Sequence, residues 1–167
     1  QDAKKDCGIS CLLAILKYYK GNISKEKLRI ITNTNKDGVN AYNLIQGAKE
    51  IGFQAKGVEG NYKELTKELL PCIAHVIINK SYSHFIVIYD INLKNKTVII
   101  MDPAKRVKKV KTSYLESITT NKTYYNYLTV PEYEYPQHGL SITNITDSSI
   151  VVSKNMDLPT ANQIQEV

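Results

Sequence analysis

Apolar side chains recur at helical intervals in the first fifty residues of the chain. Leucines with this spacing predict a helix over 10–20, and Gly21 is a suitable C-terminal stop. A serine and an asparagine stand where N-caps are expected for two further helices, over 25–31 and 41–51. The segment 33–40 between them is rich in turn formers, with an Asp-Gly pair at its centre. The chain is therefore expected to begin with three helices.

After residue 52 the pattern changes to short apolar runs and alternation, which is typical of strands. The segments 62–70 and 114–118 have helical spacing, the first ending at a proline. Valines alternating with basic residues over 105–111 indicate an exposed edge strand, although this run would also attract acidic peptides or anionic lipid. The expected strands are 53–59, 73–78, 84–91, 97–101, 105–111 and 125–130. Helices followed by a mostly antiparallel sheet predict an α+β domain with two lobes.

The final part of the chain has a weaker pattern, rich in Ser, Thr and Asn and punctuated by prolines. We therefore expect a domain over 1–136 and a linker or tail over 137–167. Within that tail, 149–153 is the stretch suited to pair as an edge strand. The chain has no initiator Met, so we expect it to be a fragment or an excised domain.

Composition excludes several classes of protein. A chain of 167 residues that is 43% hydrophobic is long enough for one globular domain with its own core. Three cysteines are an odd number, which favours a reducing compartment over a disulfide framework. The net charge of +6 permits nucleic-acid or membrane partners. The aromatic signature of RNA-binding domains and the zinc-finger spacing are absent from the sequence, so we expect no nucleic-acid partner.

Cys7 stands where a polar segment meets the first predicted helix. A helix N-terminus favours the thiolate, which is the nucleophilic form of cysteine. Gln1 lies six residues upstream, and its side-chain N–H could stabilise a developing oxyanion. The alternative is that Cys7 is a small buried residue, as free cysteines usually are, and this stretch alone leaves both interpretations open. Cys11 and Cys72 are expected to be packed in the interior.

A cysteine nucleophile needs a base, and the chain has three histidines. His138 lies in the weakly patterned tail, and His75 lies in an apolar run that predicts a buried neutral ring bonded to a neighbour. His84 opens a predicted strand after a polar turn. If this strand pairs with 96–102 so that facing residue numbers sum to 186, His84 lies opposite Asp102 on one face of the hairpin. A register shift of two residues keeps both on that face, whereas an odd shift separates them.

Taken together, Gln1, Cys7, His84 and Asp102 follow the order of a papain-type peptidase. In this hypothesis His84 takes the thiol proton and Asp102 orients the imidazole ring. Cys7 attacks a peptide carbonyl, while Gln1 and the Cys7 backbone N–H stabilise the oxyanion. His84 then protonates the leaving amine, and water hydrolyses the thioester.

The chain resembles the peptidase domain of bacteriocin-processing ABC exporters. The resemblance begins with the block Q-x-x-x-x-D-C-G-x-x-C-L over 1–12 and covers about residues 1–136. Its later pieces are Pro71 with the strand 73–78, then His84-Phe85-Ile86-Val87-Ile88, and finally Asp102-Pro103. It implies a papain-like two-lobe fold, with Cys7 as nucleophile, His84 as base, Asp102 as orienting group and Gln1 as oxyanion donor.

The same resemblance implies a cysteine endopeptidase that removes leader peptides from secreted precursors by cleaving after a Gly-Gly type motif. Its partners would be such precursors and the transmembrane and ATPase domains of an exporter that dimerises through them, at the cytoplasmic face of a bacterial plasma membrane. The tail over 137–167 would lead toward that transmembrane domain, which this chain does not contain. No cofactor is expected for peptidase activity, since ATP would serve only the ATPase domain. The alternative is a non-catalytic module that binds and tethers leaders. Such modules generally lack the cysteine, which this chain retains at Cys7.

Overall fold

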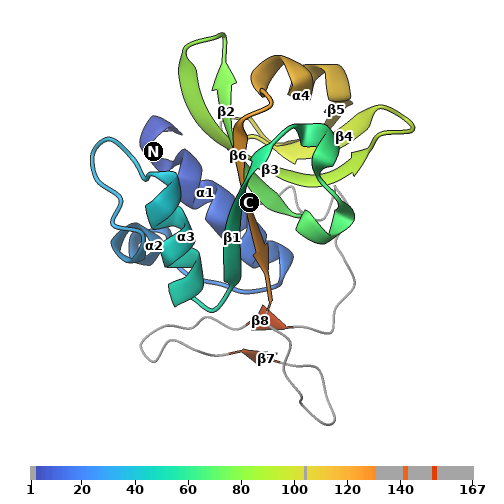
Figure 1. Ribbon diagram of the computed structural model, residues 1–167. Helices are drawn as coiled ribbons and strands as arrows, with labels where there is room; N and C mark the ends of the chain where they lie inside the picture. The colour runs from blue at the N-terminus through green and yellow to red at the C-terminus, as the bar shows by residue number, and fades with distance from the viewer. Residues whose placement is uncertain (1–2, 104, 131–140, 143–151, 154–167) are drawn as a thin grey trace.

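The computed structural model describes residues 3–103, 105–130, 141–142 and 152–153, and its elements are labelled in Figure 1. Three helices come first and lie together beside the sheet: α1 (Ala3–Tyr18), α2 (Lys25–Ile31) and α3 (Ala41–Glu50). The predicted N-caps of α2 and α3 are confirmed. Ser24 accepts a hydrogen bond from the Lys27 N–H at 3.2 Å, and Asn40 accepts one from the Asn43 N–H at 2.7 Å.

The predicted start of the first helix was wrong, because α1 begins at Ala3 and not at residue 10. Alanine and lysine are good helix formers, and Asp6 places an acidic side chain in the first turn, where the helix dipole favours it. Cys7 therefore lies inside the helix rather than at its N-terminus. The helix stop also differs, because Lys20 takes the left-handed conformation (φ 65°) and the Gly21 N–H donates to the Leu16 carbonyl at 2.8 Å.

A six-stranded sheet follows the helices, and every neighbouring pair in it is antiparallel. In spatial order its strands are β1 (Gln54–Gly60), β6 (Thr123–Thr129), β2 (Cys72–Ile78), β3 (Tyr82–Asn92), β4 (Thr97–Met101) and β5 (Val107–Lys111). The basic strand β5 is a sheet edge, as predicted. A short helix, α4 (Thr112–Ile118), joins β5 to β6. The two-lobe α+β architecture is confirmed.

The helix predicted over 62–70 is wrong. Two short 3-10 helices occupy the segment instead, η1 (Tyr62–Glu64) and η2 (Lys67–Leu69). Asn61 and Glu64 form a capping box around a single turn, after which Leu65 becomes extended and ends η1. The apolar spacing over 62–70 does not reveal that the first helical turn stops early.

The described part of the tail is a small two-stranded pair, β7 (Ser141–Ile142) with β8 (Val152–Ser153). The edge pairing predicted for 149–153 is thus found at its last two residues. The boundary between a domain over 1–136 and a tail over 137–167 stays a prediction, because most of the tail lies outside the described residues.

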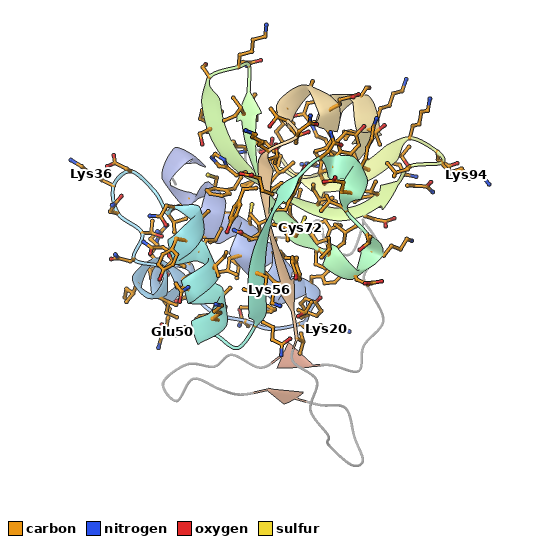
Figure 2. The ribbon with its side chains drawn as sticks, viewed as in Figure 1. Lys20, Lys36, Glu50, Lys56, Cys72 and Lys94 are labelled. Atoms are coloured by element: carbon orange, nitrogen blue, oxygen red, sulfur yellow. The ribbon has the colours of Figure 1, made fainter. Side chains whose placement is uncertain are left out.

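The sheet separates two hydrophobic cores, and β3 contributes to both. Phe85 and Val87 belong to the core under the three N-terminal helices, whereas Ile86 and Ile88 belong to the core that α4 covers. Figure 2 shows Cys72 inside the molecule, while Lys36 and Lys94 point outward from loops. The predicted burial of Cys11 and Cys72 is confirmed, and none of the three cysteines forms a disulfide bond.

Helix α1 lies along β3, and the two elements touch near both ends. Tyr18 stacks on Tyr89 with ring centroids 5.5 Å apart, while Cys7 lies beside His84. Eleven residues of helix separate Cys7 from Tyr18, a rise of about 16 Å, and five residues of strand separate His84 from Tyr89, about 17 Å. Because the two spans are nearly equal, one helix can make both contacts. Within the described residues, none of the helices has the length and apolarity needed to cross a membrane.

Candidate active site

Cys7 occupies the second turn of α1, and its side chain is 7% exposed. The next residue, Gly8, allows a close approach of the chain that follows α2. A Cβ added at Gly8 would lie 2.4 Å from the Val39 Cγ1 atom, well inside van der Waals contact. Glycine is thus required here by packing and brings Val39 against the turn that carries the thiol.

His84 and Asp102 form a buried hydrogen-bonded pair. The His84 Nε2 atom lies 2.8 Å from the Asp102 Oδ1 atom, and the two residues are 1% and 2% exposed. A ring with one nitrogen bound to a carboxylate is held in orientation, which leaves the other nitrogen for chemistry. The predicted proximity of these two residues is confirmed.

The predicted register of the hairpin was nevertheless wrong. Near the turn the paired residue numbers sum to 189, as in Asn92 with Thr97, and only beyond Ile88 do they sum to 188. The change occurs at a β-bulge that leaves Tyr89 as an extra residue in β3. A sum of 189 throughout would have placed His84 and Asp102 on opposite faces. The bulge restores the even shift that keeps them together as diagonal neighbours.

Tyr89 is the extra residue of the bulge. Its ring is 7% exposed and packs in the core beneath the helices, against Tyr18. Alternation places it there together with Phe85 and Val87, and the extra residue then puts Ile91 in the opposite core. Because nearly all residues over 85–91 are apolar, the hydrophobic pattern predicts the strand but does not reveal the bulge.

The Cys7 side chain interacts with the imidazole of His84. Burial lowers the pKa of His84, but hydrogen bonds to Asp102 and Cys7, together with the charges of both, raise it to about 9. The ring nitrogen that does not contact Asp102 is Nδ1, which is buried and has no other hydrogen-bond partner of ordinary geometry among the described residues. Nδ1 is therefore the nitrogen available to the thiol.

The remaining candidates have different outcomes. Gln1, the predicted oxyanion donor, and His138 lie outside the described residues. His75 is half-buried and hydrogen-bonded to Ser83, with its ring 5.2 Å from that of Phe85. Burial lowers the pKa of His75, which agrees with the predicted neutral, hydrogen-bonded histidine.

One participant was missed at the sequence level. Asp6, immediately before Cys7, is 4% exposed and forms an ion pair with Arg29 of α2, Oδ2 to Nη2 at 2.7 Å. Asp6 appeared in the sequence only as one position of a motif. Nothing local connects it with Arg29, because the partner lies in another helix.

A thiol, an imidazole and a carboxylate thus come together at one place, where the start of α1 meets β3 and the end of β4. These groups can carry out nucleophilic attack with proton transfer. In the described part of the chain no cluster of three or more His, Cys, Asp or Glu side chains is arranged to hold a metal ion.

Comparison with known proteins gives consistent results. Among curated sequences, the chain is 36% identical over 107 residues to a lactococcin-G-processing and transport ATP-binding protein of Lactococcus lactis. It is 33% identical over 110 residues to a mesentericin-Y105 transport/processing ATP-binding protein of Leuconostoc mesenteroides. These matches cover 63% and 65% of this chain but only 15% of each relative. The chain therefore spans a small part of the length of those proteins.

Solved structures agree with the fold. The peptidase domain of Streptococcus ComA, a bi-functional ABC transporter, superposes with a TM-score of 0.66 at 30% identity, over 78% of this chain and 95% of that domain. A double-glycine-motif protease from an AMS/PCAT transporter, solved with its leader peptide, gives a TM-score of 0.65 at 29% identity, over 77% of this chain and 85% of that one. The papain-like fold is thereby confirmed.

The model of the peptidase C39 family matches residues 1–125, which include Cys7, His84 and Asp102. The chain therefore belongs to the peptidase C39 family.

Proposed function

We propose that this chain is a cysteine endopeptidase that removes leader peptides from secreted peptide precursors by cleaving after a Gly-Gly type motif. The observation that carries the proposal is the buried contact of Cys7 with His84, which is in turn hydrogen-bonded to Asp102 at 2.8 Å. The relatives are processing and transport proteins, and one neighbour is a double-glycine-motif protease in complex with its leader peptide.

Cys7 is the nucleophile, His84 the proton carrier and Asp102 the group that orients His84. With the pKa of His84 at about 9, the imidazole holds a proton at neutral pH. The reactive state is then a Cys7 thiolate beside a His84 imidazolium, as papain-type chemistry requires. The thiolate attacks the carbonyl carbon, the imidazolium protonates the departing amine, and water releases the leader from the thioester. Gln1 is proposed to donate a hydrogen bond to the oxyanion.

Burial of the site supports the preference for glycine. Cys7, His84 and Asp102 are 7%, 1% and 2% exposed, so a peptide carbonyl must approach the sulfur atom closely. Side chains on the two residues before the scissile bond would hinder this approach, whereas two glycines bring only backbone to the thiol. We also propose that the chain serves a bacterial exporter, attached to transmembrane and ATPase domains that dimerise, at the cytoplasmic face of the plasma membrane.

The test is cleavage of a synthetic leader peptide that ends in Gly-Gly and continues for several residues, followed by mass spectrometry. We expect one cut, directly after the second glycine, and none with Cys7→Ala. A matched peptide with valine in place of the first glycine should be cut at least about 100-fold more slowly, because its side chain would hinder the approach of the carbonyl to the sulfur atom. No product from the Gly-Gly peptide, or equal product from Cys7→Ala, would reject the proposal; tight leader binding without any product would favour the tethering module.

A further inference from the structure

The ion pair between Asp6 and Arg29 lies directly beside the proposed nucleophile. The Asp6 carboxylate accepts two hydrogen bonds from the guanidinium, from Nε to Oδ1 at 3.2 Å and from Nη2 to Oδ2 at 2.7 Å. This fork-to-fork arrangement fixes the orientation of both groups. The Arg29 guanidinium holds the pKa of the Asp6 carboxyl below its ordinary value, against the opposing effect of burial.

Buried carboxylates are rare in this protein, and their placement is informative. Among the described residues, the buried ones are Asp6 and Asp102, and both lie around Cys7. Each has its own cationic partner, Arg29 for Asp6 and His84 for Asp102. Two charge pairs thus flank one thiol, and only the second takes part in the chemistry proposed above.

The segment that supplies Arg29 also holds the other side of Cys7. Arg29 belongs to α2, and the chain beyond it continues to Val39, whose side chain packs against Gly8. The Thr34 N–H donates to the Arg29 carbonyl at 2.9 Å, which ties the start of this connection to the helix. Both neighbours of Cys7 along the chain, Asp6 and Gly8, are therefore held by residues 29–39.

We propose that Asp6 and Arg29 are a positioning pair, which fixes the helical turn that carries Cys7 and cancels the carboxylate charge beside it. The inference builds on the proposed function, since it assumes that Cys7 is the nucleophile. Neither residue is a catalytic residue, and both act through the placement of Cys7 and through the charge around it.

The electrostatic consequence follows from the groups around the thiol. These are Asp6 and Cys11 of α1, Arg29 and Lys25 of α2, His84 of β3, and Asp102 after β4. Removal of the Arg29 charge would leave the Asp6 carboxylate, one residue from Cys7, without its principal compensating charge. A nearby negative charge disfavours a thiolate, so the thiol would then ionise at higher pH.

The test that needs no substrate is the pH dependence of Cys7 alkylation by iodoacetamide, with the modified peptide quantified by mass spectrometry. Cys11 and Cys72 are fully buried and provide internal references. We expect Arg29→Gln to move the midpoint up by about one pH unit. The double variant Asp6→Asn with Arg29→Gln removes both charges of the pair, and the Glu26 carboxylate that also pairs with Arg29 is 80% exposed. This variant should therefore move the midpoint back toward the wild-type value. A folded Arg29→Gln variant with an unchanged midpoint would overturn the proposal that Arg29 cancels the carboxylate charge beside Cys7.

Positioning is tested by leader cleavage. The double variant should lose about tenfold in kcat with little change in KM, because the turn is no longer held although its charge balance is restored. Arg29→Lys keeps the charge but loses the paired hydrogen bonds, so its kcat should lie between those of the wild type and the double variant. Lys67→Gln removes an exposed ion pair with Asp90 (3.8 Å) and serves as the control that leaves both readouts unchanged.

If Arg29→Gln alone fails to fold, the double variant still tests the positioning role. Cleavage by the double variant within about twofold of wild type in kcat would overturn the positioning role. If the wild-type chain cleaves no leader at all, the proposed function fails, while the alkylation midpoints still test the ion pair independently.

Discussion

The two halves of the site are aligned by different means. His84 and Asp102 lie in neighbouring strands, so backbone pairing and the bulge at Tyr89 decide whether they share a face. Cys7 lies in a helix, and side-chain contacts of its neighbours Asp6 and Gly8 with a separate segment set its place. The alignment of His84 with Asp102 therefore depends on the number of residues in the strands, whereas the position of Cys7 depends on which residues flank it. Variants directed at each half test this difference.

The largest effect is expected in the strand half, from Asp102→Asn. The variant keeps the shape of the side chain but removes the charge that raises the pKa of His84. Leader cleavage should fall by about 100-fold, within the range attributed to a misoriented proton carrier. The alkaline limb of the pH–rate profile, near 9 in the wild type, should move to lower pH. An unchanged alkaline limb would show that Asp102 does not act on His84.

The same pair should make stability depend on pH. The folded pKa of His84, about 9, lies above its ordinary value of 6.5, so the folded protein retains a proton that the unfolded chain releases between these values. The resulting stabilisation is complete below about pH 6.5 and is lost as the pH rises through 9, by on the order of 3 kcal/mol. Denaturant titrations from pH 6 to 10 should show this decline, and Asp102→Asn should flatten it.

In the helix half, Gly8→Ala should have an intermediate effect. The new methyl group must displace Val39, at an overpacking cost of about 1–3 kcal/mol, while the gain in helix propensity returns up to about 1 kcal/mol. We expect a net loss of about 1 kcal/mol in the free energy of unfolding and an approximately tenfold slower cleavage. Addition of Val39→Ala to this variant should restore most of the stability and most of the cleavage rate, because it removes the colliding Cγ1 atom. Failure of that rescue would contradict the packing explanation.

The smallest effect is expected from Ser24→Ala, which removes the N-cap of α2, the helix that carries Arg29. Loss of a cap costs about 1 kcal/mol, and cleavage should slow by about twofold as the support of Asp6 loosens. Asn40→Ala is the matched control, since it uncaps α3 at a similar cost in stability. Denaturation and cleavage should separate the two variants: equal slowing by both would mean that α2 has no special connection with the site.

Local signals in the sequence predicted much of this molecule. Helices α2 and α3 with their caps, strand β4 and the proximity of His84 to Asp102 all follow from periodicity, capping residues and the even-shift rule. The family resemblance placed Cys7 with them. These features depend on residues close in the chain or on pairing across one hairpin.

The features that escaped prediction leave no mark on the local apolar pattern. The polar start of α1 gave no apolar period, although Asp6 is held there by Arg29 of another helix. The bulge at Tyr89 decides which residues of β3 reach each of the two cores, and an almost continuous apolar run does not reveal it. The double 3-10 segment in place of one helix reflects an early stop at Leu65.

The bulge has a consequence for how this region can vary between related proteins. Substitution at Tyr89 changes what fills the core, but the count of residues between His84 and the hairpin turn is unaltered. Insertion or deletion of one residue between His84 and the turn instead shifts the register by one residue, and this turns His84 to the face opposite Asp102. Strand β3 should therefore accept changes of residue far more readily than changes of length, whereas a loop that joins two elements by side-chain contacts alone can lengthen at little cost.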